Sequence, residues 1–447
     1  MMKDESRHER PGSITTVFRH SAGAILRTAA TKSVVVCGGG IVGLSTAFYL
    51  AQDGWNVTVV ERHEEGADSC AQGSAGYISP SHVVPLAAPG MVWKGLKWML
   101  SSRSPFYIKP RLNADLMRWG WLFARSCTPE HTLRAAPVLR DLCVAGRRLF
   151  VELSELSGDA FELKREGLLN LCKTQQCLDH ESHGLAQLAN ELGITARVLD
   201  AKQTAALEPG ARMDVAGSVY FPIDAHLTPR KFMPALIALL KRKGVNFRWS
   251  TSVVGWRTEG GRVTAVQTSA GELKADEFVL AAGSWSPDMV RGLDIRLPLQ
   301  AGKGYSLTIE KPRFQLTKSL ILTERRVAAT PMGDKLRFGG TMEISGINDR
   351  IRMERVQQII DAVPHYFPDF TAADFAGIKP WFGLRPVTPD GLPYIGRFGR
   401  HPNLTAACGH AMLGVTMAPS TGLLVAEVLG GRKPFMSLEM LSPDRYA

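Results

Sequence analysis

The first strong pattern along the chain is a short apolar run, a glycine-rich turn and a longer apolar run with helical spacing. Residues 33–37, SVVVC, are apolar and β-branched without polar alternation, which is typical of a buried parallel strand. Residues 41–54 repeat apolar side chains at helical spacing and end at a glycine, and residues 56–61, NVTVVE, form a second apolar run. This order predicts a strand–helix–strand unit within a parallel sheet.

The turn between the first strand and the helix carries Gly38, Gly40 and Gly43 in G-x-G-x-x-G spacing. In such a turn the first glycine permits a tight bend, the second lets the backbone approach a pyrophosphate, and the third lets helix and strand pack closely. The helix start offers free N–H groups to phosphates, and Glu61, at the end of the second strand, can accept ribose hydroxyl groups. The pattern predicts a dinucleotide site, but the glycines alone leave both NAD and FAD open.

The residues that follow this unit favour FAD. An NAD domain usually continues with regular βαβ repeats, whereas this chain turns to ADSCAQGSAGYISPSH, which is small and polar. Within it, the run Gly73, Ser74, Ala75 and Gly76 would let the backbone lie close to a flat ligand. We therefore expect a flavin against residues 73–76.

Two later segments predict further parts of a nucleotide-binding fold. Residues 231–244 are amphipathic with helical spacing and follow Thr228 as N-cap and Pro229 in the first turn. Residues 245–268 then indicate strands with a hairpin at a Gly-Gly pair, and DEFVLAAGSWS predicts a buried strand that runs into a turn.

The remaining segments show a different pattern. Residues 111–156 indicate helices, and residues 302–344 indicate antiparallel strands broken by Pro331 and Gly333. Together they predict a sheet that covers a pocket, with helices behind it.

Four parts of the chain together resemble the FAD-dependent D-amino-acid oxidase superfamily and, within it, the D-amino-acid dehydrogenase branch. They are CGGGIVG…VVERH, QGSAGYISPSHVVPLAAPGMVWKGLKWML (72–100), FVLAAGSWSP (278–287) and the pair GLRPVTPDGLPYIGR…GHAMLGVTMAPSTG (383–397, 409–422). The resemblance extends over nearly the whole chain from Ser33, and the second segment points to the dehydrogenase branch.

The resemblance implies an α/β protein with a discontinuous, Rossmann-like FAD-binding domain and a substrate domain of antiparallel sheet plus helices. The FAD-binding domain would comprise residues 33–95, 226–298 and 383–447, and the substrate domain residues 96–225 and 299–382. Residues 1–32 lack a secretory h-region, and we expect them to form a disordered tail.

The resemblance also implies the residues that contact FAD. In similar enzymes the backbone near the position of Val254 contacts the adenine, and N–H groups at the start of a late helix point at the flavin O2, where reduced flavin gathers negative charge. The full expected set is Gly38, Gly40, Ile41, Val42, Gly43, Glu61, Arg62, Gly73, Ser74, Ala75, Gly76, Val254, Ala282, Gly283, Leu413, Gly414, Val415 and Thr416.

We expect the FAD to be non-covalent. Members of the family with covalent flavin carry a Cys near the position of Leu384, or a His just before the loop of residues 74–76. This chain has Leu384 and Gly73 in those places.

The substrate residues are carried over in the same way. Arg385 lies where the family places the arginine that grips the substrate carboxylate, and a guanidinium can hold a carboxylate with two parallel hydrogen bonds. Tyr305 would donate to the other carboxylate oxygen or line the pocket, with ordinary packing as an equal alternative. Lys303 would share a strand face with Tyr305 and is a candidate for the lysine that aids oxygen reactivity in related oxidases. His82 and His410 are further candidates, each with a structural role as the alternative.

The implied reaction is oxidative deamination of a D-amino acid, with D-proline and hydroxy-D-proline among the candidates, by hydride transfer from Cα to flavin N5. Electrons would pass to a quinone or another carrier, and no side-chain base is required. Two alternatives stay open. One is a glycine- or sarcosine-type amine oxidase that uses oxygen. The other is a tRNA-modifying flavin oxidase, which is favoured to a small degree by the net charge of +11, of which +8 lies beyond residues 1–33.

Composition adds limits on partners and compartment. Seven scattered cysteines without paired Cys or His spacing argue against a zinc site and for a reducing compartment, so no metal is expected. No run of about 18 apolar residues is apparent, so no transmembrane helix is expected. We expect a cytoplasmic enzyme without a nucleic-acid partner, with peripheral contact with the inner face of the membrane as an alternative.

Overall fold

A six-stranded sheet carries the predicted strand–helix–strand unit. The computed structural model describes residues 31–99 and 106–447, and Lys32–Ala447 form one unit. The strand order is β19-β20-β13-β1-β2-β9, and every neighbouring pair is parallel except β19 with β20. The strands are β1 (Ser33–Cys37), β2 (Asn56–Val60), β9 (Asn246–Arg248), β13 (Glu277–Leu280), β19 (Tyr394–Arg397) and β20 (Leu404–Cys408).

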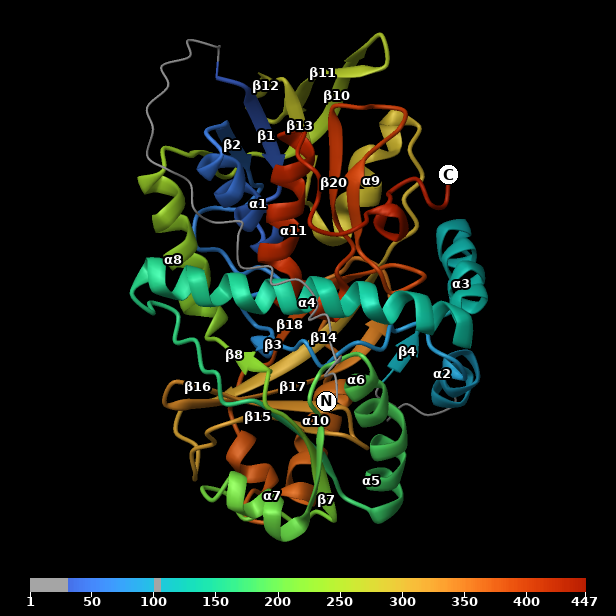
Figure 1. Ribbon diagram of the computed structural model, residues 1–447. Coiled ribbons are helices and arrows are strands. Elements are labelled where there is room, and N and C mark those ends of the chain that lie inside the picture. The colour runs from blue at the N-terminus through green and yellow to red at the C-terminus, as the bar shows by residue number, and fades with distance from the viewer. Residues whose placement is uncertain (1–30, 100–105) are drawn as a thin grey trace, which may run out of the picture. The chain divides into compact units, whose positions relative to one another are not determined.

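Two apolar helices, α1 (Ile41–Gln52) and α11 (Gly414–Leu429), pack on each other beside this sheet. A Cβ on Gly422 of α11 would lie 2.6 Å from the carbonyl oxygen of Ser45 in α1, so glycine permits the close approach of the two helices. Figure 1 shows α11 in red between α1 and the long helix α4 (Pro129–Ser157), which crosses it.

The segment Ala411–Leu429 corrects one expectation. It is long and apolar enough to span a membrane by length and composition, although no such stretch was expected from the sequence. However, 67% of it is buried inside the fold, between α1 and α4. Its apolar composition is therefore that of a core helix.

The second large sheet has nine strands among the described residues, in the order β18-β14-β17-β16-β15-β5-β7-β6, with β4 beside β17. Its pairs are antiparallel except β15 with β5 and β17 with β4. The strands are β4 (Phe106–Ile108), β5 (Leu168–Cys172), β6 (Arg197–Asp200), β7 (Gly217–Phe221), β14 (Gln300–Ile309), β15 (Ser319–Leu322), β16 (Val327–Met332), β17 (Lys335–Ile344) and β18 (Trp381–Val387).

Smaller elements complete the fold. A three-stranded sheet contains β10 (Val253–Glu259), β11 (Arg262–Thr268) and β12 (Gly271–Lys274), and β3 (Tyr77–Ile78) pairs with β8 (Ala225–His226). The other helices are α2 (Met91–Met99), α3 (Ala114–Ser126), α5 (Gln175–Glu181), the π-helix η1 (Ser182–Ala186), α6 (Gln187–Glu191), α7 (Ala201–Leu207), α8 (Pro229–Arg242), α9 (Ser286–Val290) and α10 (Met353–Tyr366). Short 3₁₀ turns are η2 (Gly283–Trp285), η3 (Arg291–Leu293), η4 (Ala372–Phe375), η5 (Ala411–Leu413) and η6 (Glu439–Leu441).

These elements confirm the α/β fold class and most of the predicted segments. The helix after Thr228 begins at Pro229, and the hairpin turns at Gly260 and Gly261, both of which have positive φ. Pro331 does not break a strand, because it lies inside β16 and pairs with Leu336. The domain boundary proposed at residue 383 falls within β18, which belongs to the nine-stranded sheet. The proposed tail, residues 1–32, lies almost entirely outside the described residues.

Packing of α4 against α11 provides a test of the fold. Gly146 of α4 lies so close to α11 that a Cβ would be 2.0 Å from the Thr416 carbonyl oxygen, whereas a Cβ on Gly120 of α3 meets nothing within 4 Å. We expect Gly120→Ala to stabilise the protein by about 0.5–1 kcal/mol through helix propensity. Gly146→Ala should instead destabilise it by about 1–3 kcal/mol, because the helices must separate. Urea unfolding of both variants with bound FAD measures the difference, and equal stabilisation by the two alanines would contradict this packing.

Candidate functional site

One large cavity lies against strands of both large sheets. Its volume is about 2050 Å³, which exceeds the several hundred Å³ of an ordinary small-molecule pocket and suits a dinucleotide together with a substrate. Most of the expected site residues line it. They are Gly38, Gly40, Ile41, Val42, Glu61, Arg62, Gly73, Ser74, Ala75, Gly76, His82, Val254, Ala282, Gly283, Tyr305, Arg385, His410, Leu413, Gly414, Val415 and Thr416. Gly43 and Lys303 are not part of its wall.

The three glycines after β1 each have a separate structural reason. Gly38 has φ +121°, and a Cβ there would lie 2.5 Å from the Ala281 carbonyl oxygen of the strand next to it. A Cβ on Gly43 would lie 1.9 Å from the Gly38 carbonyl oxygen, so Gly43 serves helix packing rather than direct contact with a ligand. At Gly40 a Cβ meets nothing within 4 Å, so the start of α1 is open toward the cavity. No side chain caps this helix start, which leaves its first N–H groups for an anionic ligand.

The end of β2 holds an oriented carboxylate. Glu61 accepts hydrogen bonds from the N–H of Gly39 at 2.8 Å and of His63 at 3.1 Å. Next to it, the Arg62 guanidinium lies 3.8 Å from the ring centre of Trp285. The register of β10 with β11 shifts at Val254, whose side chain is 70% exposed, so this residue is a bulge with backbone groups outside the ladder. These features fit the ribose and adenine end of a dinucleotide.

The small-residue loop at residues 72–76 is held by side chains that the sequence analysis missed. Arg337 donates from Nη1 to the carbonyl oxygens of Gln72 (2.9 Å) and Ser74 (2.8 Å), and Ser306 donates to that of Gly73 (2.8 Å). The three carbonyls therefore point to the sheet. Arg337 could not be found from spacing, because its contact joins residues 263–265 positions apart.

Glycine at positions 73 and 76 also has a reason within the protein. A Cβ on Gly73 would lie 2.0 Å from the indole ring of Trp381, and a Cβ on Gly76 would lie 2.2 Å from the Leu227 carbonyl oxygen. The space that a side chain would need is therefore filled by the protein itself, while residues 73–76 line the cavity. Trp381 also lines the cavity and was not among the expected residues.

The start of α11 faces the cavity, as expected. No side chain caps this helix at Leu413, and Gly414 and Val415 line the wall. The Thr416 hydroxyl accepts a hydrogen bond from the Ser79 N–H and donates one to the Tyr77 carbonyl oxygen, both at 3.1 Å. The helix start and the segment after the small-residue loop are thus fixed to each other. Uncapped N–H groups and the helix dipole favour a negative charge at this point.

Arg385 comes from β18 and lies over the neighbouring strand β14. Glycine at position 304 makes this possible, because a Cβ there would lie 2.2 Å from the guanidinium. Arg385 Nη1 donates to the Thr341 carbonyl oxygen at 2.8 Å. In residues 31–99 and 106–447 no carboxylate lies within salt-bridge distance of Arg385, and burial lowers its pKa. A half-buried cation without a carboxylate partner is a natural site for an anionic ligand.

The carbonyl that holds Arg385 comes from a bulge in β17. The pairing of β14 with β17 shifts between Lys303 and Tyr305, opposite Gly340 and Glu343, so β17 carries the extra residue. Thr341 in this bulge has φ +60°, which is strained for a β-branched residue. Strain of this kind concentrates at functional sites, and here it accompanies a carbonyl that points to Arg385.

Lys303 and Tyr305 share a strand face as predicted, but it is the opposite face from Arg385. In the β14–β18 register, Lys303 pairs with Leu384 and Tyr305 with Phe382, whereas Gly302 pairs with Arg385. Lys303 donates to the Arg350 carbonyl oxygen at 2.8 Å and to the Asn348 side chain, and it lies 5.0 Å from the Phe382 ring centre.

The hydroxyl of Tyr305 is engaged within the protein. It donates to Glu343 at 3.3 Å and accepts from the Arg352 N–H at 3.4 Å, and the side chain is 1% exposed. The geometry therefore supports the packing alternative for Tyr305. It gives no support to Lys303 as a residue beside the cofactor.

The two histidines lie in the wall in neutral surroundings. Burial lowers the pKa of His82 to about 4 and that of His410 to about 3, so both rings are neutral near pH 7. His410 Nε2 lies 2.8 Å from the Thr421 hydroxyl in α11, which supports a structural role. His82 Nδ1 lies 3.3 Å from the Ser81 hydroxyl, and Ser81 in turn hydrogen-bonds the buried Asp224.

Cys70 is a cavity residue that the sequence analysis missed. A Cβ on Gly383 would lie 3.1 Å from its sulfur, which places the thiol beside the strand that carries Arg385. Burial raises the pKa of the Cys70 thiol to about 11, although Arg385 acts in the opposite direction. A thiol in this state is a poor nucleophile near neutral pH.

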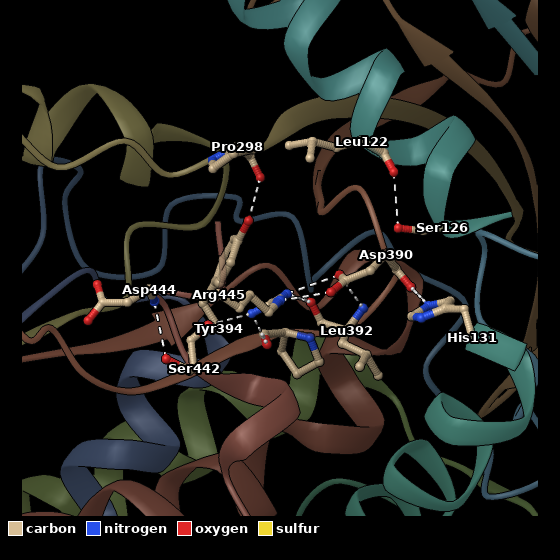
Figure 2. A network of polar contacts seen from close by, with 11 residues as sticks. Leu122, Ser126, His131, Pro298, Asp390, Leu392, Tyr394, Ser442, Asp444 and Arg445 are labelled. Carbon is tan, nitrogen blue, oxygen red and sulfur yellow. Dashed lines mark hydrogen bonds and ion pairs between the residues drawn. The ribbon is translucent and has the colours of Figure 1, made fainter. Parts of the chain in front are cut away.

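The loop after β18 is fixed by the C-terminal segment, as Figure 2 shows. Arg445 donates to the two carboxylate oxygens of Asp390, from Nε at 2.7 Å and Nη2 at 3.0 Å, and to the Leu392 carbonyl oxygen at 2.7 Å. The Arg445 guanidinium also lies 4.0 Å from the ring centre of Tyr394. His131 Nε2 lies 2.8 Å from the Asp390 carbonyl oxygen and connects the loop to α4. A buried, bidentate ion pair of this kind fixes the backbone directly after Arg385.

Comparison with known proteins decides the family. Residues 33–428 match the family model described as FAD dependent oxidoreductase. The chain belongs to this family. It is 34% identical over 419 residues to the D-amino acid dehydrogenase of Granulibacter bethesdensis, covering 93% of this chain and 99% of that protein. It is 36% identical to the D-amino acid dehydrogenase of Methylobacterium nodulans, covering 92% and 99%.

Solved structures of other oxidoreductases share the fold. The glycine oxidase of Geobacillus kaustophilus has a TM-score of 0.75 at 21% identity and covers 93% of this chain and 100% of its own. The L-proline dehydrogenase of P. horikoshii has a TM-score of 0.69 at 20% identity, covering 93% and 98%. The cofactor of this enzyme is FAD, and the open glycine turn, the oriented Glu61 and the uncapped start of α11 fit it.

Among the described residues, no group of three or more His, Cys, Asp and Glu side chains could hold a metal ion. All seven cysteines lie in the described part of the chain and are free thiols.

The first prediction for the site concerns flavin attachment. We expect acid precipitation to release yellow FAD into the supernatant, because the Cys70 thiol beside the cavity is protonated and unreactive. Absorbance of the supernatant and the pellet measures the release, with Cys70→Ser as control. Colour that stays in the wild-type pellet but is released from Cys70→Ser would contradict non-covalent binding and identify the attachment site.

The second prediction concerns Asp224. Burial raises the pKa of this carboxyl from 3.8 to about 7, against the hydrogen bonds from Ser81 and the charge of Arg147. Since the folded-state pKa lies above the unfolded value, Asp224 contributes stability at low pH that is lost as pH rises through about 7. Asp224→Asn cannot ionise, so its stability relative to wild type should increase between pH 4 and pH 7 and then level off.

Urea unfolding across this pH range measures the effect. Ser81→Ala removes a hydroxyl that lowers the Asp224 pKa, so it should move the pH-dependent window of the wild-type protein upward. A constant stability difference between wild type and Asp224→Asn at all pH values would show that Asp224 does not titrate as its burial indicates.

Proposed function

We propose that this protein is an FAD-dependent D-amino-acid dehydrogenase. The single observation that carries the proposal is Arg385, a half-buried cation in the cavity wall with no carboxylate partner among the described residues. The relatives that bear the name D-amino acid dehydrogenase match over nearly their full length and support the same substrate class. D-Proline and hydroxy-D-proline are the candidates within that class.

Arg385 would bind the substrate carboxylate. One of its five N–H donors is used by the Thr341 carbonyl, which fixes the guanidinium plane and leaves other donors for the ligand. Two parallel charge-assisted hydrogen bonds hold a carboxylate in position and in orientation. Because Gly304 leaves the space under the guanidinium free of a side chain, the arginine can lie flat along the sheet.

Three titratable groups of the cavity wall are uncharged near neutral pH. The rings of His82 and His410 are uncharged near pH 7, and burial keeps the Cys70 thiol protonated. A bound ammonium group would therefore meet low polarity and the positive charge of Arg385, and both favour loss of its proton. When bound, FAD supplies the two-electron acceptor for oxidation of the neutral amine to an imine.

The electron acceptor is proposed to be a quinone or another carrier. Lys303, the residue considered for oxygen reactivity, donates its hydrogen bonds to Asn348 and Arg350 on the sheet face away from Arg385. This position does not support Lys303 as an oxygen-activating residue, and the glycine- or sarcosine-type oxidase stays the alternative. Steady-state turnover with a dye acceptor compared with oxygen tests the acceptor, and we place the enzyme in the cytoplasm.

The test of the substrate role is Arg385→Lys. Lysine keeps the charge but loses the planar fork, so the substrate can rotate in the cavity. Charge-assisted hydrogen bonds contribute about 1.5–3 kcal/mol each, so loss of one should lower kcat/KM by roughly 10- to 150-fold. Arg385→Ala should lower it further, because the carboxylate would be left unpaired in a closed cavity. Turnover of D-amino acids with a dye acceptor, and the FAD content, are the measurements.

An amine without a carboxylate is the control for this variant. Wild type should oxidise it slowly, and Arg385→Ala should leave that residual rate nearly unchanged. If Arg385→Ala oxidises D-amino acids at the wild-type rate, or loses its FAD, Arg385 does not bind the carboxylate and the proposed substrate class loses its main support.

A further inference from the structure

Helices α2 and α3 carry large apolar side chains that nothing in the described chain covers. In α2 the exposed fractions are 74% for Trp93, 52% for Leu96 and 39% for Val92, and in α3 they are 61% for Met117 and 58% for Trp121. We call these five residues the α2–α3 face. Single exposed apolar residues are common on protein surfaces, but a group with two indoles marks an interaction surface.

The inner sides of the same helices pack against the rest of the protein. Gly95 of α2 faces the Phe106 ring of β4, which a Cβ would approach to 3.8 Å. Leu116 and Trp119 of α3 are buried, and the Trp119 indole donates to the Val387 carbonyl oxygen at 2.9 Å. Within residues 31–99 and 106–447, each helix therefore has a packed inner side and an apolar outer side that stays exposed.

The two helices lie next to each other. The backbone of Val92, at the start of α2, lies near enough to the Cys127 thiol, at the C-cap of α3, to act on its pKa. Figure 1 shows α2 and α3 together, beside β4, at the margin of the view. The exposed side chains of α2 and α3 therefore belong to one side of the molecule.

The charge of the segments that carry this face is mainly positive. Residues 91–99 and 106–126 contain six Lys and Arg residues and a single acid, Asp115, which pairs with Arg291 at 3.4 Å. Lys94 and Lys97 are exposed on either side of Leu96, and the Arg125 guanidinium lies 4.7 Å from the Trp121 ring centre. Two copies of this chain that met through the face would bring like charges together, which disfavours a symmetric dimer.

An opening of the main cavity lies within the same region. Lys94 of α2 and Phe106 of β4 line the cavity, as do Ile347 and Met412, whose exposed fractions are 44% and 55%. Phe106 and Ala411 pack on the same small core as Leu116 and Trp119 of α3, and Ile347 follows Ile344 of that core closely in sequence. The face therefore borders a mouth of the cavity that holds the site described above.

We infer that the α2–α3 face docks on the surface of an anionic lipid bilayer. Indole rings place an apolar body in the acyl boundary and an N–H at the headgroups, and Lys and Arg side chains reach the phosphates from the rim. Docking in this way presents the cavity mouth to the bilayer. The inference rests on exposure and charge, and it holds whichever amine is the substrate.

The test uses the purified holoenzyme and vesicles of phosphatidylcholine with and without phosphatidylglycerol. Wild type should co-sediment with the anionic vesicles and be released by salt. The double variant Trp93→Ser/Leu96→Ser should weaken this binding at least about tenfold, because insertion of a Trp or Leu contributes more than one power of ten. The control Leu156→Ser/Phe435→Ser removes apolar residues that are 58% and 41% exposed elsewhere and should bind as wild type does.

Two further measurements separate lipid docking from other causes. Lys94→Gln/Lys97→Gln should lower binding to anionic vesicles about tenfold, and Lys202→Gln/Lys274→Gln, at exposed positions outside the face, should not. Brominated lipids should quench the tryptophan fluorescence of wild type, and Trp93→Phe/Trp121→Phe should lose most of that quenching. Trp93 and Leu96 do not line the cavity, so their variant should keep its FAD and its turnover with a soluble dye.

Three results would overturn the inference. One is no vesicle binding at low salt, and another is equal loss of binding in the Trp93/Leu96 variant and in its matched control. The third is concentration-dependent self-association without lipid that Leu96→Ser abolishes, which would assign the face to a second copy of the chain. None of these results bears on Arg385, so failure here is distinct from failure of the proposed substrate class.

Discussion

The pairing of β14 with β18 decides which side chains share a sheet face with Arg385. In this register Gly302 and Gly304 of β14 lie on the same face as Arg385, and the missing side chain at 304 leaves room for its guanidinium. Lys303 and Tyr305 lie on the other face, where Tyr305 packs in the core with residues of α10 and Lys303 donates to the Arg350 carbonyl oxygen. A register shift by one residue would exchange the two faces and place a lysine and a tyrosine where the glycines are. The chemistry of the cavity wall therefore depends on backbone pairing more than on any single side chain.

Burial keeps three titratable groups of the cavity wall uncharged. The pKa values of His82, His410 and Cys70 all shift toward the uncharged form, in each case mainly through loss of solvent. Near pH 7 these groups contribute little charge, so the guanidinium is a strong local positive potential in a cavity of low polarity. An anion gains more from this arrangement than a neutral ligand does. The same surroundings disfavour a second cation. An amino acid binds with an ammonium group as well as a carboxylate, so this effect favours loss of the ammonium proton.

The sequence was sufficient where the structure depends on local patterns. Strand, glycine turn and helix are adjacent in the chain, and Gly38 and Gly43 have the structural roles that their spacing predicts. Alternation along β14 correctly placed Lys303 and Tyr305 on one face, but alternation cannot say which face meets the cavity. That depends on pairing with β18, some 80 residues away in the chain. The contacts of Arg337 with the loop at residues 72–74, the bulge at Thr341 and the proximity of Cys70 to Gly383 were missed for the same reason.

Three arginines show how the protein separates structural from ligand-binding cations. Arg445 is neutralised by Asp390 and surrounded by carbonyl groups, and burial and this carboxylate act on its pKa in opposite directions with a net rise. Arg337 has no carboxylate in its hydrogen bonds and instead binds the carbonyls of Gln72 and Ser74, and burial lowers its pKa to about 10. Arg385 has only the Thr341 carbonyl among the hydrogen bonds of the described residues. Desolvation of a guanidinium is costly unless its N–H donors are hydrogen-bonded. The three arginines therefore differ in how far the protein itself offsets this cost. The charge of Arg445 is neutralised by Asp390, and the donors of Arg337 are used by the loop carbonyls. Of the three, Arg385 is therefore the cation whose desolvation is compensated only when an anion binds.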